Sequence, residues 1–112
     1  MDNIEILKGK PHIIVEIIEY IPNAVVTKTI IKKTTGNVTV FSVDAGEELS
    51  EKIFPFDNYI QIIDGSAELT VNNKFYKLNV GQGMTIPAHA TQLFNASVQF
   101  KMISTIIKSG YE

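Results

Sequence analysis

Apolar and polar residues alternate through most of the last two thirds of the chain, and this alternation predicts β-strands rather than helices. Short stretches rich in Val, Ile, Thr and Phe are separated by Gly, Asn and Asp. The expected strands are 24–33, 37–46, 58–65, two strands within 66–81, then 83–87, 90–97 and 98–108. Asp64-Gly65 is a strong turn signal, and Asn72-Asn73 suits a tight hairpin turn because asparagine tolerates positive φ.

The first third of the chain is less regular. Residues 11–21 place apolar side chains at 13, 14, 17, 18 and 21, which is helical spacing, and Pro11 suits a first helical turn. The β-branched content of the same stretch argues against a helix. A short N-terminal helix and an extended segment both stay open. No repeat or linker is visible, so we expect one all-β domain over 1–112, built as a sandwich or small barrel.

Composition narrows the function classes. The 112 residues carry a net charge of −2, and all ten basic residues are lysines. Specific nucleic-acid readout leans on arginine, so no nucleic-acid partner is expected. Because the chain has no cysteine, disulfides, thiolate nucleophiles and Cys-ligated zinc are excluded. The N-terminus lacks a secretion signal and the apolar runs are too short to cross a bilayer, so the expectation is a cytoplasmic protein with no membrane partner.

Two stretches resemble the motifs of the cupin family. "GEELSEKIFPFDNYIQIIDG" (46–65) has the length and the glycine ends of the first cupin motif, and "GQGMTIPAHATQLFN" (81–95) has those of the second. The text between them is also typical of cupins. The resemblance implies a double-stranded β-helix, that is, a cupin or jelly-roll barrel, and it implies a homodimer.

The residues that would hold the family's metal depart from its pattern. The resemblance puts the ligand positions on Lys52, Phe54, Asn58 and Gln92, and none is a histidine or a carboxylate. His89 lies three residues before the last of these positions, so it is not the family ligand. A Zn, Fe or Mn site needs three or four convergent donors, and the chain has only one other histidine, His12. We therefore expect no metal and no cofactor.

Strand alternation puts Asn58, Ile60 and Ile62 on one face of their strand, and the resemblance makes this face the barrel interior, where a small-molecule pocket is expected instead. Inward-facing amides and a lysine among apolar side chains are the usual make-up of such a site. The candidate ligand-binding residues are Lys52, Phe54, Asn58, Ile60, Ile62, His89, Gln92 and Phe94. The expected ligand is small and polar or anionic, with Lys52 supplying positive charge. The plainer alternative is that these residues only fill the barrel, that Lys52 reaches solvent, and that His89 lies on an exposed loop.

Three function classes remain. The preferred one is a metal-free ligand-binding barrel. The alternative is a cupin-type enzyme, either a metal-dependent oxygenase or isomerase with unusual ligands or a metal-free isomerase that uses Lys52 or His89. The third is an interaction module with a vestigial site. Candidate residues for a dimer face are Tyr59, Gln61, Phe75, Tyr76 and Phe100.

Overall fold

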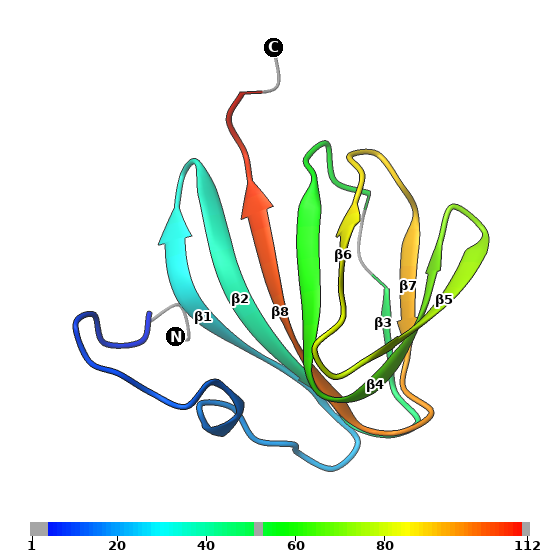
Figure 1. Ribbon diagram of the computed structural model, residues 1–112, viewed down its shortest axis with the longest axis horizontal. Coiled ribbons are helices and arrows are strands. Elements are labelled where there is room, and N and C mark those ends of the chain that lie inside the picture. The colour runs from blue at the N-terminus through cyan, green and yellow to red at the C-terminus, as the bar shows by residue number, and fades with distance from the viewer. Residues whose placement is uncertain (1–4, 51–52, 111–112) are drawn as a thin grey trace.

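A computed structural model describes residues 5–50 and 53–110, and over these residues the chain is all-β (Figure 1). The elements are η1 (Ile14–Glu16), β1 (Val25–Lys33), β2 (Gly36–Val43), β3 (Glu48–Ser50), β4 (Asn58–Val71), β5 (Lys74–Asn79), β6 (Gly83–Ile86), β7 (Gln92–Asn95) and β8 (Phe100–Ile107). This confirms the all-β expectation. Among the described residues no helix is long and apolar enough to span a membrane.

The strands form one curled antiparallel sheet with the order β1-β2-β8-β4-β7-β3. Strand β4 holds the curl together. Its first half pairs with β8 and β6, and its second half pairs with β5 and β7. The sheet therefore folds back on itself as a half-barrel, open at the end where β4 begins (Figure 1).

The core lies on the concave face of this sheet. Alternation along the first half of β4 buries Ile60 and Ile62 completely, and after the register shift between Ile62 and Asp64 the opposite parity buries Leu69. Phe94 of β7 meets Phe100 of β8 with their ring centroids 6.4 Å apart. The inward orientation expected for the isoleucines of β4 is thus observed. The placement of Phe100 at a dimer face is wrong, because its position on β8 has the parity of the concave face.

One of the two turn predictions is confirmed and the other is wrong. Asn72 (φ 49°) and Asn73 (φ 68°) join β4 to β5 in a tight hairpin. At Asp64-Gly65 the chain does not turn back, because β4 runs on through both residues with a register shift between Ile62 and Asp64. Gly65 has φ 71°, which lets the strand bend there instead of ending.

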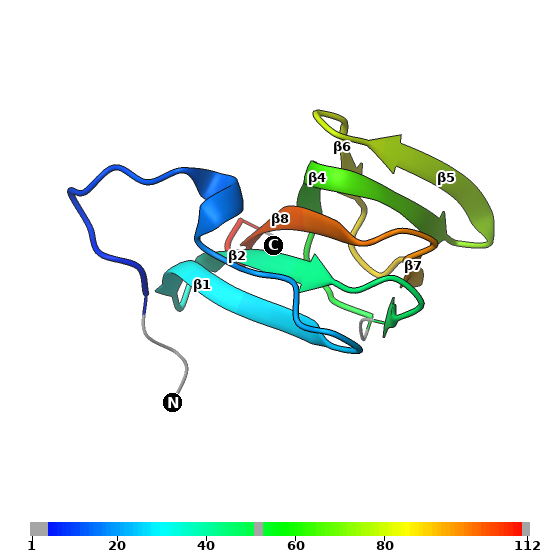
Figure 2. The same cartoon turned by 90° about the horizontal axis from the view of Figure 1, so that it is seen from below.

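The N-terminal residues form a strap rather than a regular helix. We use the name N-terminal strap for residues 5–24, which contain only the three-residue 3₁₀ helix Ile14–Glu16. The strap lies over the outer face of the sheet (Figure 2), where η1 contacts β4 and hydrogen bonds tie the strap to β2 and β8. Ile18 of the strap is buried, and Ser42 Oγ of β2 donates a hydrogen bond to the Glu19 carbonyl of the strap at 2.9 Å.

A buried lysine fixes the strap to the sheet. Lys101 of β8 is 8% exposed, and its Nζ donates to the Val15 carbonyl at 2.6 Å. The same ammonium lies 4.8 Å from the centre of the Tyr20 ring. The Tyr20 hydroxyl donates to Asp64 at 2.6 Å, and burial together with this hydrogen bond raises the pKa of Tyr20. The strap is therefore anchored at the bend of β4.

Candidate functional site

A cavity of about 190 Å³ opens at the mouth of the half-barrel. Its walls come from β2, β4, β7 and β8 and from the segment that leads into β4. The described lining residues are Asn37, Thr39, Phe41, Phe54, Asn58, Phe94, Met102, Ser104, Ile106 and Lys108. Aromatic and aliphatic side chains thus share the cavity with amides, hydroxyls and one ammonium, which is the composition of small-molecule sites.

Two buried polar side chains meet in this cavity. Asn58 begins β4 and is 5% exposed, and Ser104 of β8 is 4% exposed. They come together because β4 and β8 pair with Asn58 opposite Ile106, so the Ser104 side chain reaches the same concave face. Ser104 Oγ donates to Asn58 Oδ1 at 2.6 Å. Besides this accepted bond, the Asn58 carboxamide carries two N–H donors, so it can pair with an acceptor on a ligand.

Lys108 brings the positive charge. It follows the last residue of β8 and continues the inward parity of Ser104 and Ile106. Its backbone N donates to the Thr35 carbonyl at 2.7 Å, which holds the chain end against the β1–β2 turn. The side chain is exposed, so the ammonium lies at the rim rather than inside. Among the described lining residues Lys108 is the only charged one.

The structure brings some of the candidate residues together and separates others. Phe54, Asn58 and Phe94 line the cavity, whereas Ile60 and Ile62 are buried in the core cluster. That any of these five residues binds a ligand stays a prediction. Lys52 lies outside the described residues, so its place relative to the cavity is not described.

Gln92 is buried on β7 but is not among the described residues that line the cavity. Its Oε1 has no hydrogen-bond partner within the described part of the chain. A buried carboxamide oxygen without a partner is costly, because it has lost its hydration without replacement.

His89 completes a turn. It is exposed, has φ 68°, and donates its backbone N–H to the Phe54 carbonyl at 2.7 Å. Next to it, the Ala88 N–H donates to Asp57 Oδ1 at 2.8 Å. The loop of His89 therefore fixes the backbone that presents Phe54 to the cavity, while its imidazole is not among the described lining groups.

Four polar lining residues were not singled out in the sequence: Asn37, Thr39, Ser104 and Lys108. Their signal was present in the strand parity. Asn37 and Thr39 alternate with outward residues along β2, and Thr39 Oγ1 donates to Asn37 Oδ1 at 3.4 Å. The cupin motifs directed attention to β4 and β7, whereas β2 and β8 lie outside both motifs.

The donors in the cavity do not suit the metal that the fold family implies. Within residues 5–50 and 53–110, no three His, Cys, Asp or Glu side chains gather where they could hold a metal ion. The described cavity offers carboxamides, hydroxyls and an ammonium, and a cationic Lys108 repels a divalent ion.

Comparisons with known proteins agree with the architecture. A scan against protein-family models finds no match, and a search of curated proteins finds none. Among solved structures, a conserved protein of unknown function from Streptococcus pyogenes is 26% identical over 96% of this chain and 93% of its own, with a TM-score of 0.86.

Two other solved structures carry the family name. A cupin superfamily protein from Desulfitobacterium hafniense is 22% identical over 92% of this chain and 94% of its own, with a TM-score of 0.85. A cupin 2 conserved barrel domain protein from Leptotrichia buccalis is 25% identical over 84% of this chain and 46% of its own, with a TM-score of 0.80. The resemblance seen in the two motifs is thereby confirmed: the chain has the fold of the cupin superfamily.

Proposed function

We propose that this chain is a small-molecule-binding cupin barrel whose site is the cavity at the barrel mouth, and that it works without the usual cupin metal. The observation that carries the proposal is the buried pair Asn58–Ser104, which lies among aromatic and aliphatic lining residues with Lys108 at the rim. Burying a polar group costs free energy unless the group is hydrogen-bonded. Side chains that only filled the barrel would therefore be apolar, whereas this pair is polar.

Size and chemistry together define the ligand class. An apolar protein cavity of about 150 Å³ holds one benzene molecule, so about 190 Å³ suits one ring with a small substituent. The rings of Phe41, Phe54 and Phe94 provide an apolar wall for such a ring. Asn58 would donate to an oxygen on the ligand, and the Lys108 ammonium would attract an anionic group at the mouth. A single-ring carboxylate meets all three requirements.

Calorimetric titration with benzoate, benzamide and benzylamine tests this proposal. Benzoate should bind best, because only it offers a negative charge to Lys108. Lys108→Met should weaken benzoate binding by ~1 kcal/mol, about fivefold, since the ammonium is exposed and water screens it. The same change should leave benzamide binding unaltered.

Two further variants sharpen the result. Lys52→Met asks whether the second lysine, expected from the cupin motif to stand at the mouth, also contributes to anion binding. Lys77→Met, an exposed lysine on β5 away from the described lining, is the matched control and should bind as the wild type does. If no single-ring compound binds the wild type, or if Asn58→Leu binds benzoate unchanged, the cavity is not the binding site.

A further inference from the structure

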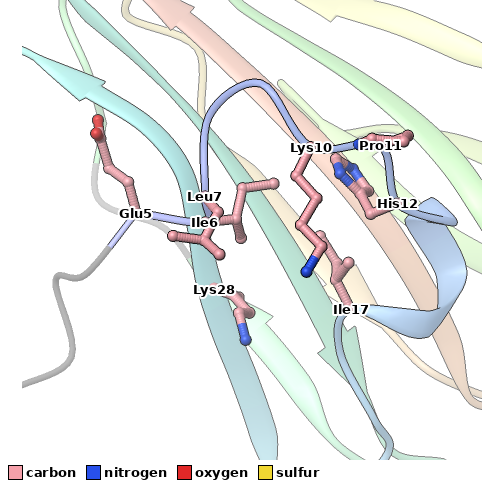
Figure 3. A pocket seen from close by; sticks show the side chains of 8 residues that line it. All are labelled: Glu5, Ile6, Leu7, Lys10, Pro11, His12, Ile17 and Lys28. Atoms are coloured by element: carbon pink, nitrogen blue, oxygen red, sulfur yellow. The ribbon is translucent and has the colours of Figure 1, made fainter.

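A second and larger hollow lies outside the barrel, beneath the N-terminal strap. It measures about 540 Å³, well within the ~300–1,000 Å³ of ligand pockets. Figure 3 shows the strap arching over the outer face of β1, with side chains from both sides around the space. The binding site proposed at the barrel mouth does not include this hollow.

The arch is held at both ends, so the hollow is a built feature of the fold. At its start the Glu5 carboxylate accepts a hydrogen bond from the backbone N of Lys32 on β1. This bond lowers the pKa of Glu5, which keeps the anchor ionised. At its end the Val15 carbonyl accepts from Lys101 Nζ. Between these anchors the chain turns at Gly9, whose φ is 74°.

The lining of the hollow has an apolar part and a cationic part. Ile6, Leu7 and Ile17 supply hydrocarbon, and Leu7 is 73% exposed although it faces a pocket. Lys10 comes from the strap and Lys28 from β1, and both ammonium groups point toward the same, lower side of the view in Figure 3.

No described carboxylate of the hollow neutralises the positive charges of Lys10 and Lys28. Glu5 is the only carboxylate among the described lining residues, and it is turned away from the hollow in Figure 3. Its ion-pair contact is with Lys8, at 3.9 Å. No described residue forms an ion pair with Lys10 or Lys28. Two ammonium groups that pair with no described residue, beside exposed hydrocarbon, favour a ligand that is anionic at one end and apolar at the other.

We propose that the hollow beneath the strap is a second binding site, which takes an amphipathic monoanion of the aliphatic carboxylate class. The hydrocarbon chain lies on Ile6, Leu7 and Ile17, and the carboxylate meets Lys10 and Lys28. A chain of about ten carbons suits a pocket of this size. Binding buries the exposed leucine and neutralises the two ammonium groups, and it leaves the barrel mouth free.

Titration with decanoate, decanol and decylammonium, each below its micelle concentration, tests the site. Decanoate should bind more tightly than decanol, and decylammonium should bind most weakly. The double variant Lys10→Gln/Lys28→Gln should lose about tenfold in decanoate affinity and little in decanol affinity, as expected for two solvent-screened charge contacts. Lys77→Gln, outside both sites, is the matched control and should bind like the wild type.

Amide chemical-shift mapping on the wild-type protein locates the ligand independently of any variant. Decanoate should perturb the amides of residues 6–12 and 28, and benzoate should not. The proposal is overturned if decanoate shifts map to the barrel mouth, or if the double variant binds decanoate as the wild type does. It is also overturned if self-association excludes decanoate, because a second copy of the chain would then fill the hollow.

Discussion

Replacing Gly65 by alanine should destabilise the fold far more than an ordinary glycine substitution. Two effects add. A residue with a Cβ pays about 1–2 kcal/mol to adopt the left-handed conformation that Gly65 has at φ 71°. In addition, a Cβ would lie 2.1 Å from the Gln99 carbonyl oxygen and 3.0 Å from Phe100 Cα. Both are backbone atoms of the neighbouring segment, so β8 would have to move away from the bend of β4.

We expect Gly65→Ala to cost at least ~3 kcal/mol, a large share of the ~5–15 kcal/mol that stabilises a typical domain. Gly46→Ala is the matched control, because Gly46 also has positive φ (88°) but no atom within 4 Å of an added Cβ. It should cost only the conformational part, about 1–2 kcal/mol. Urea unfolding followed by far-ultraviolet circular dichroism measures both. Equal losses for the two variants would refute the close approach at the bend.

Three other predictions concern the site, the strap and assembly. Ser104→Ala should lower the free energy of unfolding by ~1–3 kcal/mol, because it leaves the buried Asn58 Oδ1 without its donor; a loss no larger than that of an exposed serine would contradict the buried pair. Because folding raises the pKa of Tyr20, the free energy of unfolding that its protonated hydroxyl contributes should be fully present below about pH 10 and should fall as the pH rises further. Urea midpoints measured across this range should show the fall in the wild type and a smaller one in Tyr20→Phe. We also propose a homodimer through the outer face of β4 and β8, where Tyr59 is 44% and Ile107 59% exposed. Light scattering should give twice 12.5 kDa for the wild type and 12.5 kDa for the double variant Tyr59→Asp/Ile107→Asp. A mass of 12.5 kDa for the wild type would exclude the dimer.

The strands were predictable because their signals are local. Alternation placed Ile60 and Ile62 on one face, the resemblance to cupins made that face the interior, and two asparagines marked the β4–β5 turn. Asp64-Gly65 misled because the same dipeptide serves a hairpin turn and a strand bend, and only the distant β8 decides between them. The N-terminal segment stayed open between a helix and an extended segment for a similar reason, since its apolar spacing serves an anchored strap as well as a helix.

The candidate site was only partly predictable. Asn58, Phe54 and Phe94 lie inside the two motifs, so a pattern search reaches them. Ser104 and Lys108 lie outside both motifs, and their place depends on the register of β8 against β4. Register is a long-range property, because it is set by packing between strands whose paired residues lie 35 to 48 positions apart in the chain. Strand parity can list inward residues, but it does not say which strands meet.

The pairing of β2 with β8 bears on the order in which the protein can fold. Val43 pairs with Phe100 and Gly36 with Ile107, so the β1–β2 hairpin finds its sheet neighbour only when the last strand is available. During synthesis the hairpin leaves the ribosome early and has no sheet to join, which leaves its inner face uncovered. Contacts this distant in sequence also slow the search for the native state. The cavity, whose walls include both β2 and β8, is therefore completed among the last parts of the molecule, and a chain that stops before β8 lacks this cavity.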